Sequence, residues 1–258
     1  MELSQEQITF FRQNGFVRLD AITTQEEIIR LRAIYDRLFE QKSGRNEGQQ
    51  FDLAGTDEDD KEAKLPQILS PSTYAPELKD SLYHRNALTV AQQLLGPTAA
   101  YTGEHAILKP PRIGAETPWH QDEAYWNPGQ YHESISIWMP LQEATLENGC
   151  MQFIPMDTAG DVLPHHSINH DPRIHGLEMD TVDASQAVAC PIPAGGATIH
   201  HCRIPHYAGP NRSDTPRRAY ILVFGLPTEA RETARDFHWQ RERQTARQER
   251  HRNAQMKN

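Results

Sequence analysis

The chain has 258 residues, a hydrophobic content of 37% and a formal net charge of −9 at pH 7. This length suffices for one large domain whose core needs no disulfides or structural metal. The acidic balance argues against a nucleic acid or an anionic membrane surface as partner. Three widely spaced cysteines without a CxxC pattern indicate free thiols in a reducing compartment. No apolar run approaches the roughly 20 residues of a membrane span, so we expect a cytoplasmic protein with no membrane partner.

The first part of the chain, residues 1–98, predicts a helical cover. Ser4 and Thr24 are each followed three residues later by Gln or Glu, the capping-box pattern that starts a helix. Between these two helices, residues 16–19 alternate as a strand would. A third helix is predicted over 76–95, ending at Gly96. Helices with a single apolar stripe must cover another element, and a sheet is the expected partner.

A polar segment, residues 44–64, interrupts this helical region. It lacks hydrophobic periodicity and contains the acidic run 57–60. Long segments of this kind are either solvated loops or functional ones. Two interpretations therefore stay open, a solvated loop and a mobile flap over an active site.

Residues 99–225 change to short β-like runs separated by Gly, Pro and Asn turns. The predicted strands cover 101–108, 134–139, 150–154, 187–192, 197–202 and 218–224. Asn148-Gly149 predicts a hairpin before the third of these runs. The pattern predicts a mainly β fold with flanking helices, a barrel or a jelly roll, as the core of a single domain 1–258. The charged, Arg-rich tail 226–258 is interpreted as a solvated helix or a frayed end.

The strongest chemical candidate is the pair His120 and Asp122. Two residues apart on an extended strand, their side chains point to the same face and can bind one cation. The motif alone has a high false-positive risk because the chain holds 13 histidines. Trp119 before it and the Gly/Pro-rich approach 110–114 raise its significance.

A second segment supplies the matching groups. His206 follows a predicted strand, and the turn-rich residues 209–214 lead the chain back into a strand that begins at Arg217. Two imidazoles and one carboxylate leave three metal positions open, the arrangement of non-heme Fe(II) oxygenases. A 2-oxo acid fills two of these positions and O2 the third. The far carboxylate of 2-oxoglutarate suits the bidentate fork of an arginine such as Arg217, whereas Arg218 should face the other way. The two segments must then meet at one end of one barrel.

These residues carry a family resemblance. The matching features are Lys109-Pro110-Pro111, Pro118-Trp119-His120-Gln121-Asp122, Trp138, Asn148-Gly149-Cys150, Phe153-Ile154-Pro155, and His206 with Asn211 followed by Arg217. With them the chain resembles the phytanoyl-CoA dioxygenase family of Fe(II)/2-oxoglutarate oxygenases, which includes ectoine hydroxylase. The resemblance covers roughly residues 5–225.

The resemblance implies a fold and a set of site residues. The fold would be a double-stranded β-helix, a cupin-like jelly roll flanked by helices. His120, Asp122 and His206 would be the catalytic iron ligands, Arg217 would bind 2-oxoglutarate, and Trp138 would line the cosubstrate pocket. Because Asp122 fills the position that a halide would need, hydroxylation or a related oxidation of an unactivated C–H in a small organic substrate is expected, rather than halogenation. No CoA-binding pattern is evident, so phytanoyl-CoA is not implied as the substrate.

Other residues have both a functional and a structural interpretation. His105 could contact the cosubstrate or be a core histidine, and Trp138 could simply be a core aromatic. His201 could support the ligands, and Asn211 is interpreted first as a turn residue. Lys64 and Lys109 could add positive charge near an anionic ligand.

A histidine-rich stretch contains His165, His166, His170 and His175. The spacing fits no closed zinc pattern, and we expect a loop near the mouth of the site.

Two rival functions remain at this stage. A metal-dependent hydrolase on a cupin-like barrel would use the same open triad to activate water. A non-catalytic sensor would bind metal and 2-oxoglutarate without turnover.

Overall fold

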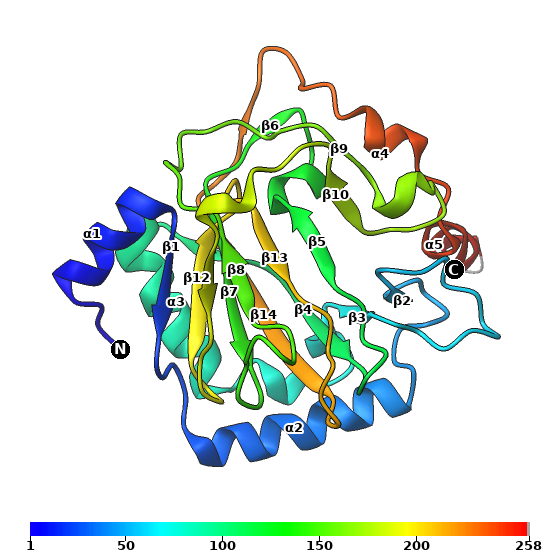
Figure 1. The fold of residues 1–258 in the computed structure, drawn as a ribbon, viewed down its shortest axis with the longest axis horizontal. Helices are drawn as coiled ribbons and strands as arrows, with labels where there is room; N and C mark the ends of the chain where they lie inside the picture. The colour runs from blue at the N-terminus through cyan, green and yellow to red at the C-terminus, as the bar shows by residue number, and fades with distance from the viewer. Residues whose placement is uncertain (257–258) are drawn as a thin grey trace.

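The computed structural model describes residues 1–256, and in them the chain is mainly antiparallel β with flanking helices (Figure 1). The large sheet has the strand order β1-β12-β7-β14-β4-β3-β2. Its strands are β1 (Phe16–Leu19), β2 (Gln50–Asp52), β3 (Pro66–Leu69), β4 (Ala100–Lys109), β7 (Ser134–Pro140), β12 (Ala197–His201) and β14 (Arg217–Gly225).

A smaller sheet has the order β11-β8-β13-β5, and two further strand pairs lie outside the sheets. The small sheet contains β5 (Thr117–His120), β8 (Met151–Phe153), β11 (Val188–Cys190) and β13 (His206–Ala208). The separate pairs are β9 (His165–Ser167) with β10 (Leu177–Met179), and β6 (Gln130–Tyr131) with β15 (Glu229–Ala230).

Five α-helices and five short 3-10 turns complete the described chain. The helices are α1 (Gln5–Asn14), α2 (Gln25–Glu40), α3 (Leu82–Leu95), α4 (His238–Glu242) and α5 (Ala246–Gln255). The turns are η1 (Pro71–Thr73), η2 (Pro76–Leu78), η3 (Asp122–Tyr125), η4 (Ile168–His170) and η5 (Ala184–Gln186).

The helices α1, α2 and α3 pack on one face of the large sheet. Ser4 forms the predicted capping box, and Thr24 accepts a hydrogen bond from the Glu27 amide. In α2 one apolar face is buried, and the hydroxyl of its Tyr35 donates to the carbonyl of Ala219 on β14 (2.7 Å). The third helix begins at Leu82, later than expected, because two 3-10 turns occupy the start of the segment. These three helices therefore cover one face of the sheet.

The opposite face of the large sheet packs against the small sheet. A second hydrophobic cluster joins Phe16 and Ile221 of the large sheet to Met151 and Phe153 of the small one. The rings of Phe16 and Phe153 stack with centroids 4.7 Å apart. The two sheets thus enclose an interior layer, and the functional residues lie in it.

The hairpin predicted at Asn148-Gly149 is wrong. The strand before it, β7, belongs to the large sheet, and the strand after it, β8, belongs to the small one, so this loop carries the chain between sheets. Asn148 stabilises the loop by accepting from the Thr145 amide and donating to the Glu143 carbonyl. Gly149 has φ +85°, and a Cβ there would collide with the Gly209 carbonyl. The same residue types serve hairpins and tight crossings, which explains the error.

The interpretation of the tail as a solvated helix or a frayed end is wrong for the stretch around residues 237–239, which is buried. Phe237 and Trp239 are each 4% exposed, and the Trp239 indole donates to the Ala124 carbonyl (2.9 Å). Upstream, Arg235 pairs with the buried carboxylate of Glu123 (2.6 Å). Arginine-rich composition suggests solvation, but here a distant carboxylate and two aromatic side chains hold the segment on the domain.

Residues 44–64 are more ordered than a solvated loop. They contain β2, and the buried Asp52 accepts hydrogen bonds from the amides of Ala54, Lys64 and Leu65. Residues 58–62 are mostly exposed, as predicted. The flap interpretation stays a prediction.

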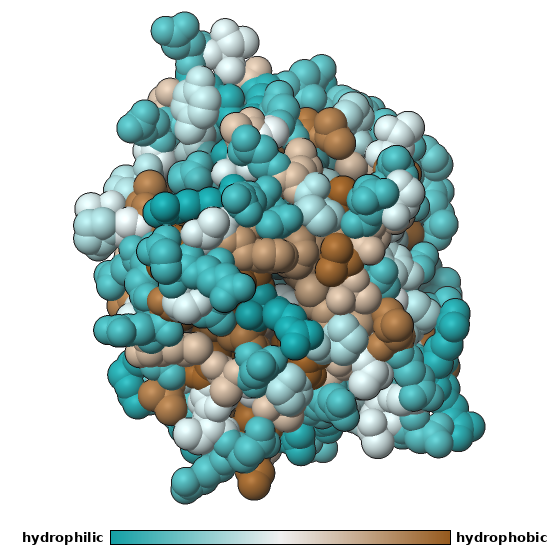
Figure 2. Space-filling view, turned by 60° about the vertical axis from the view of Figure 1, so that its left-hand side comes forward, coloured by the Kyte–Doolittle hydropathy of each residue, from teal (hydrophilic) through white to brown (hydrophobic). Residues whose placement is uncertain are grey.

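The surface in Figure 2 is mostly hydrophilic, with hydrophobic side chains gathered in small areas between polar ones. Within residues 1–256, no helix has the length and apolar character needed to cross a membrane.

Candidate active site

A cavity of about 650 Å³ lies between the two sheets. Its lining includes His120, Asp122 and His206, together with Arg217 and Trp138. The volume is typical of a small-molecule site. The two segments predicted to meet therefore do meet, in one cavity.

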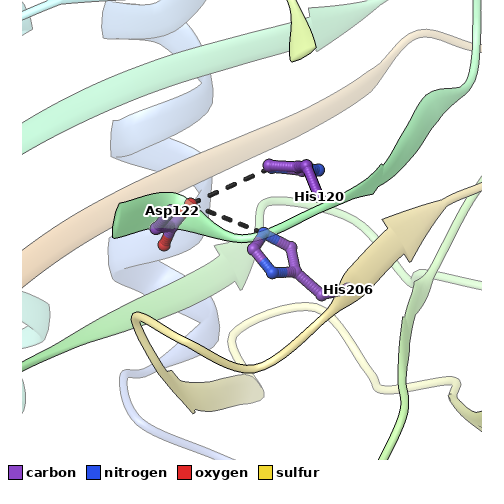
Figure 3. Close-up of side chains that lie close together, drawn as sticks. All are labelled: His120, Asp122 and His206. Carbon is purple, nitrogen blue, oxygen red and sulfur yellow. Dashed lines mark ion pairs between the residues drawn. The ribbon is translucent and has the colours of Figure 1, made fainter. Parts of the chain in front are cut away.

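Strand pairing brings the two histidines together. His120 and His206 are direct partners across the antiparallel pair β5 and β13, and Figure 3 shows their side chains converging with that of Asp122. Asp122 Oδ1 lies 3.5 Å from His206 Nε2 and 3.9 Å from His120 Nε2. Within residues 1–256, this is the one group of His, Cys, Asp and Glu whose ligand atoms lie close enough to hold a metal ion.

The local backbone departs slightly from the predicted extended strand. β5 ends at His120, and Asp122 opens the 3-10 turn η3. Gln121 between them keeps extended dihedrals (φ −120°, ψ 134°), so its neighbours still share a face. Its own side chain points away and donates to the Arg203 carbonyl (2.6 Å). The predicted geometry is therefore achieved by one extended residue rather than by a continuous strand.

Backbone carbonyls orient both imidazoles. His120 Nδ1 lies 2.7 Å from the Pro118 carbonyl, and His206 Nδ1 lies 2.9 Å from the Ile204 carbonyl. A carbonyl can only accept, so each Nδ1 carries the proton and donates. Each Nε2 then directs its lone pair toward Asp122, which is how metal-binding histidines are commonly fixed.

The charge states also suit a metal. Burial lowers the pKa of His206 well below its ordinary value, and His120 and His200 nearby lower it further. Burial alone would raise the pKa of Asp122, but His206 and His200 outweigh it and hold that pKa well below its usual range. Neutral imidazoles and an ionised carboxylate are the forms that bind a cation.

Two residues that hold the carboxylate were not found from the sequence. Ser136 Oγ donates to Asp122 Oδ2 (2.6 Å), and His200 Nε2 lies 3.2 Å from the same oxygen. Ser136 and His200 are partners across β7 and β12. With Oδ2 held in this way, Oδ1 faces the two imidazoles. The signal was the position of Ser136 two residues before Trp138, which places both side chains on the same face.

His201 does not support the ligands, contrary to the sequence interpretation. Its Nε2 lies 3.0 Å from Glu133 Oε1, on the side of β12 opposite His200. Neighbouring strand residues point to opposite faces, so only one of the two histidines can reach the cavity.

Arg217 is a buried, charged residue that lines the same cavity as the triad. It is 1% exposed, and its Nε and Nη1 have no hydrogen-bond partner among the described residues. Burial lowers its pKa to about 9. Its guanidinium carbon lies 5.3 Å from the centre of the Trp138 ring. A buried cation without a partner is costly unless a ligand supplies the anion, so the geometry fits a bound carboxylate.

Arg218, the next residue along the strand, faces away from the cavity, as predicted. Arg218 Nε pairs with Asp36 on α2 (2.6 Å), on the other face of the sheet. The strand β14 lies in the large sheet and β13 in the small one. His206 and Arg217 thus line one cavity from two different sheets.

Of the remaining candidate residues, some line the cavity and others stabilise the backbone around it. His105 lines the cavity, and burial lowers its pKa to about 4. Lys109 is buried and donates to the carbonyls of Ala208 (2.8 Å) and Gly209 (2.6 Å), so its ammonium group is already satisfied. Lys64 does not line the cavity.

Asn211 is a turn residue, as predicted. Its amide donates to the carbonyls of Lys109 and Thr215, which fastens the turn that leads into β14.

The histidine-rich stretch serves separate purposes. His165 is fully buried, and its Nε2 accepts from the Gln121 amide (3.2 Å). His166 and His170 stack with ring centres 3.7 Å apart. His175 alone of the four lines the cavity.

The family model for phytanoyl-CoA dioxygenase (PhyH) matches residues 11–219. The chain belongs to the phytanoyl-CoA dioxygenase family. The resemblance noted in the sequence is thereby confirmed.

Solved structures extend this family assignment. EvdO2 from Micromonospora carbonacea var. aurantiaca is similar with 41% identity, a TM-score of 0.80, and coverage of 93% of this chain and 97% of that one. A structure of EvdO2 with 2-oxoglutarate matches with 40% identity and a TM-score of 0.79, at the same coverage.

Curated relatives are more distant. A probable alpha-ketoglutarate-dependent hypophosphite dioxygenase of Stutzerimonas stutzeri is 26% identical over 62% of this chain and 56% of its own length. A phytanoyl-CoA dioxygenase domain-containing protein of Bos taurus is 31% identical over 45% of this chain and 41% of its own length. The chain thus matches about half of the length of these relatives.

Proposed function

We propose that this member of the phytanoyl-CoA dioxygenase family is an Fe(II)- and 2-oxoglutarate-dependent oxygenase. It would hydroxylate or otherwise oxidise an unactivated C–H of a small organic substrate, with O2 as oxidant and 2-oxoglutarate decarboxylated to succinate and CO2. The observation that carries the proposal is the presence of an open His–Asp–His triad and an unpaired, buried arginine in one cavity. A hydrolase would need the triad but not the arginine.

Each group has a defined role in this proposal. His120, Asp122 and His206 hold the metal and leave three positions open. Arg217 binds the far carboxylate of 2-oxoglutarate, and Trp138 and His105 line the cosubstrate pocket beside it. The metal and cosubstrate supply the oxidising power, while the protein positions the reactants and excludes water.

The architecture proposed for this function is a double-stranded β-helix, that is, a cupin-like jelly roll. Two antiparallel sheets packed face to face, with helices on the outer face of one, support it. We propose one oxygenase domain with residues 1–98 as cover, 99–225 as core and 226–256 along one side of the cavity. The three buried free thiols are compatible with a reducing, cytoplasmic location.

The test begins without oxygen. Fe(II) and then 2-oxoglutarate are added to the purified protein, and the visible absorption band of the chelate is recorded. Arg217→Met should raise the 2-oxoglutarate concentration needed for the band, whereas the control Arg218→Met, on the opposite face of the same strand, should not. Absence of a band in metal-loaded wild type would refute the proposal and favour a hydrolase. Succinate release on admitting oxygen distinguishes an enzyme from a sensor.

A further inference from the structure

One wall of the cavity carries two arginines that the proposed chemistry does not use. Arg243 and Arg247, from the C-terminal segment, line the same cavity as the triad and Arg217. Figure 1 shows α4 and α5 on the side of the molecule where β10 and β2 lie. The C-terminal segment therefore contributes directly to the cavity.

Neither guanidinium is neutralised by the protein. Within residues 1–256, Arg243 and Arg247 form no ion pair, and Arg243 Nε and Nη2 and Arg247 Nε are buried without a hydrogen-bond partner. Other arginines of the same segment do have carboxylate partners, as Arg235 has Glu123 and Arg241 has Asp236. Carboxylates thus pair with Arg235 and Arg241 outside the cavity, whereas none pairs with the two arginines inside it.

The neighbours of the two arginines are aromatic and uncharged. The Arg243 guanidinium carbon lies 5.1 Å from the centre of the Tyr125 ring, and that of Arg247 lies 5.1 Å from the Phe51 ring. Burial raises the pKa of Tyr125 to about 12. Burial, followed by the charges of Arg243 and Arg247, lowers the pKa of His175 well below its ordinary value. The ring centre of His175 lies 4.7 Å from that of Phe51 and 6.0 Å from that of Tyr125.

This positive end of the cavity is close to the metal site. The ring centres of Tyr125 and His120 are 6.0 Å apart, and Arg243 lies over the same tyrosine. One aromatic ring thus separates a guanidinium from a proposed metal ligand. Because the triad and both arginines line one cavity, a molecule bound in it can contact both.

We infer that the substrate carries an oxyanion, a carboxylate or a phosphate, that Arg243 and Arg247 bind while its reacting carbon faces the triad. Paired guanidinium groups with free N–H donors match the geometry of such anions. Without an anion, two like charges would be buried side by side at a cost in stability. This inference rests on the proposed function, because it names the substrate class for that site.

The direct test measures anion binding by the full chain. The probes are inorganic phosphate and acetate, titrated into the protein with Fe(II) and saturating 2-oxoglutarate under anaerobic conditions, so that Arg217 is occupied. Wild type should bind one of the two, and the preferred anion indicates whether the group is a phosphate or a carboxylate. Arg243→Met/Arg247→Met should weaken this binding at least about tenfold, since charge-assisted hydrogen bonds are lost. The matched control Arg241→Met, on an exposed and paired arginine, should bind like wild type.

Thermal unfolding provides a second readout that does not depend on turnover. The preferred anion should raise the midpoint of wild type and of Arg241→Met, but not that of the double variant. Without the anion, the double variant should unfold at or above the wild-type temperature, because it no longer buries two uncompensated charges. A lower midpoint would show that the arginines act as structural groups and would overturn the inference.

A search for the substrate tests the anionic substrate class separately from the proposed oxygenase function. A metabolite extract is divided on an anion-exchange resin, and each fraction is incubated with enzyme, Fe(II), 2-oxoglutarate and oxygen. Products heavier by one oxygen should arise only from the retained fraction. Products from the unretained fraction would refute the anionic substrate while leaving the oxygenase intact. A double variant that loses 2-oxoglutarate binding would instead assign these arginines to the cosubstrate. Failure of the proposed function would show as a missing 2-oxoglutarate band in wild type.

Discussion

Substitution of Ser136 tests how the protein orients the carboxylate of Asp122, a proposed metal ligand. Its hydroxyl is buried and donates to Asp122 Oδ2 over 2.6 Å. A hydrogen bond to a charged acceptor contributes about 1.5–3 kcal/mol, and loss of a partner behind a metal ligand commonly weakens metal affinity about 10- to 100-fold. His200, whose Nε2 lies 3.2 Å from the same oxygen, is unchanged by the substitution. We therefore expect Ser136→Ala to raise the Fe(II) dissociation constant about tenfold, toward the lower end of that range.

The assay is anaerobic calorimetric titration of metal-free protein with Fe(II). Ser134→Ala is the matched control, because Ser134 lies two residues earlier on the same strand, is also buried, and lines the cavity. Its hydroxyl is not bonded to Asp122 in the described structure. Indistinguishable dissociation constants for the two variants would refute the idea that Ser136 orients the carboxylate. Ser136→Thr, which keeps a hydroxyl, should recover part of the affinity.

Three further predictions address the triad, the cosubstrate and pH. Asp122→Ala should abolish Fe(II) binding by titration and succinate release, and normal turnover would mean that the triad is wrong. Arg217→Lys should raise the 2-oxoglutarate requirement about tenfold or more, because an ammonium cannot reproduce the bidentate contact; steady-state kinetics that match wild type would contradict this role. Burial lowers the pKa of His105 to about 4, so the unfolded chain takes up this proton first as pH falls. The stability due to His105 is therefore present above about pH 6.5 and declines toward pH 4, by roughly 2 kcal/mol between pH 7 and 5. Urea unfolding at pH 7 and pH 5 should show that the free energy of unfolding falls less in His105→Gln than in wild type. An equal fall in both proteins would contradict the assignment to His105.

The sequence predicted those parts of the site that follow from local periodicity. His120 and Asp122 share a face because the single residue between them is extended, and strand alternation anticipates this. Arg217 and Arg218 diverge for the same reason. The helix starts at Ser4 and Thr24 were equally local, since an N-cap depends on residues within one turn.

The parts that were missed depend on partners distant in sequence. Ser136 and His200 meet at Asp122 only because β7 and β12 pair in one particular register, and alternation within either strand does not specify that register. The C-terminal segment was misjudged because its burial depends on Glu123, far upstream. Composition describes the average environment of a segment and not its individual contacts.

The cross-strand pairing of His120 with His206 links metal loading to the folding of the small sheet. A slip of one residue between β5 and β13 would turn His206 to the opposite face. In the proposed function, an ion bound by both histidines adds its binding free energy to the correct register alone. Iron would then act as a folding cofactor as well as a catalytic one. Iron starvation would consequently reduce the amount of folded enzyme in the cell, beyond its effect on the activity of each molecule.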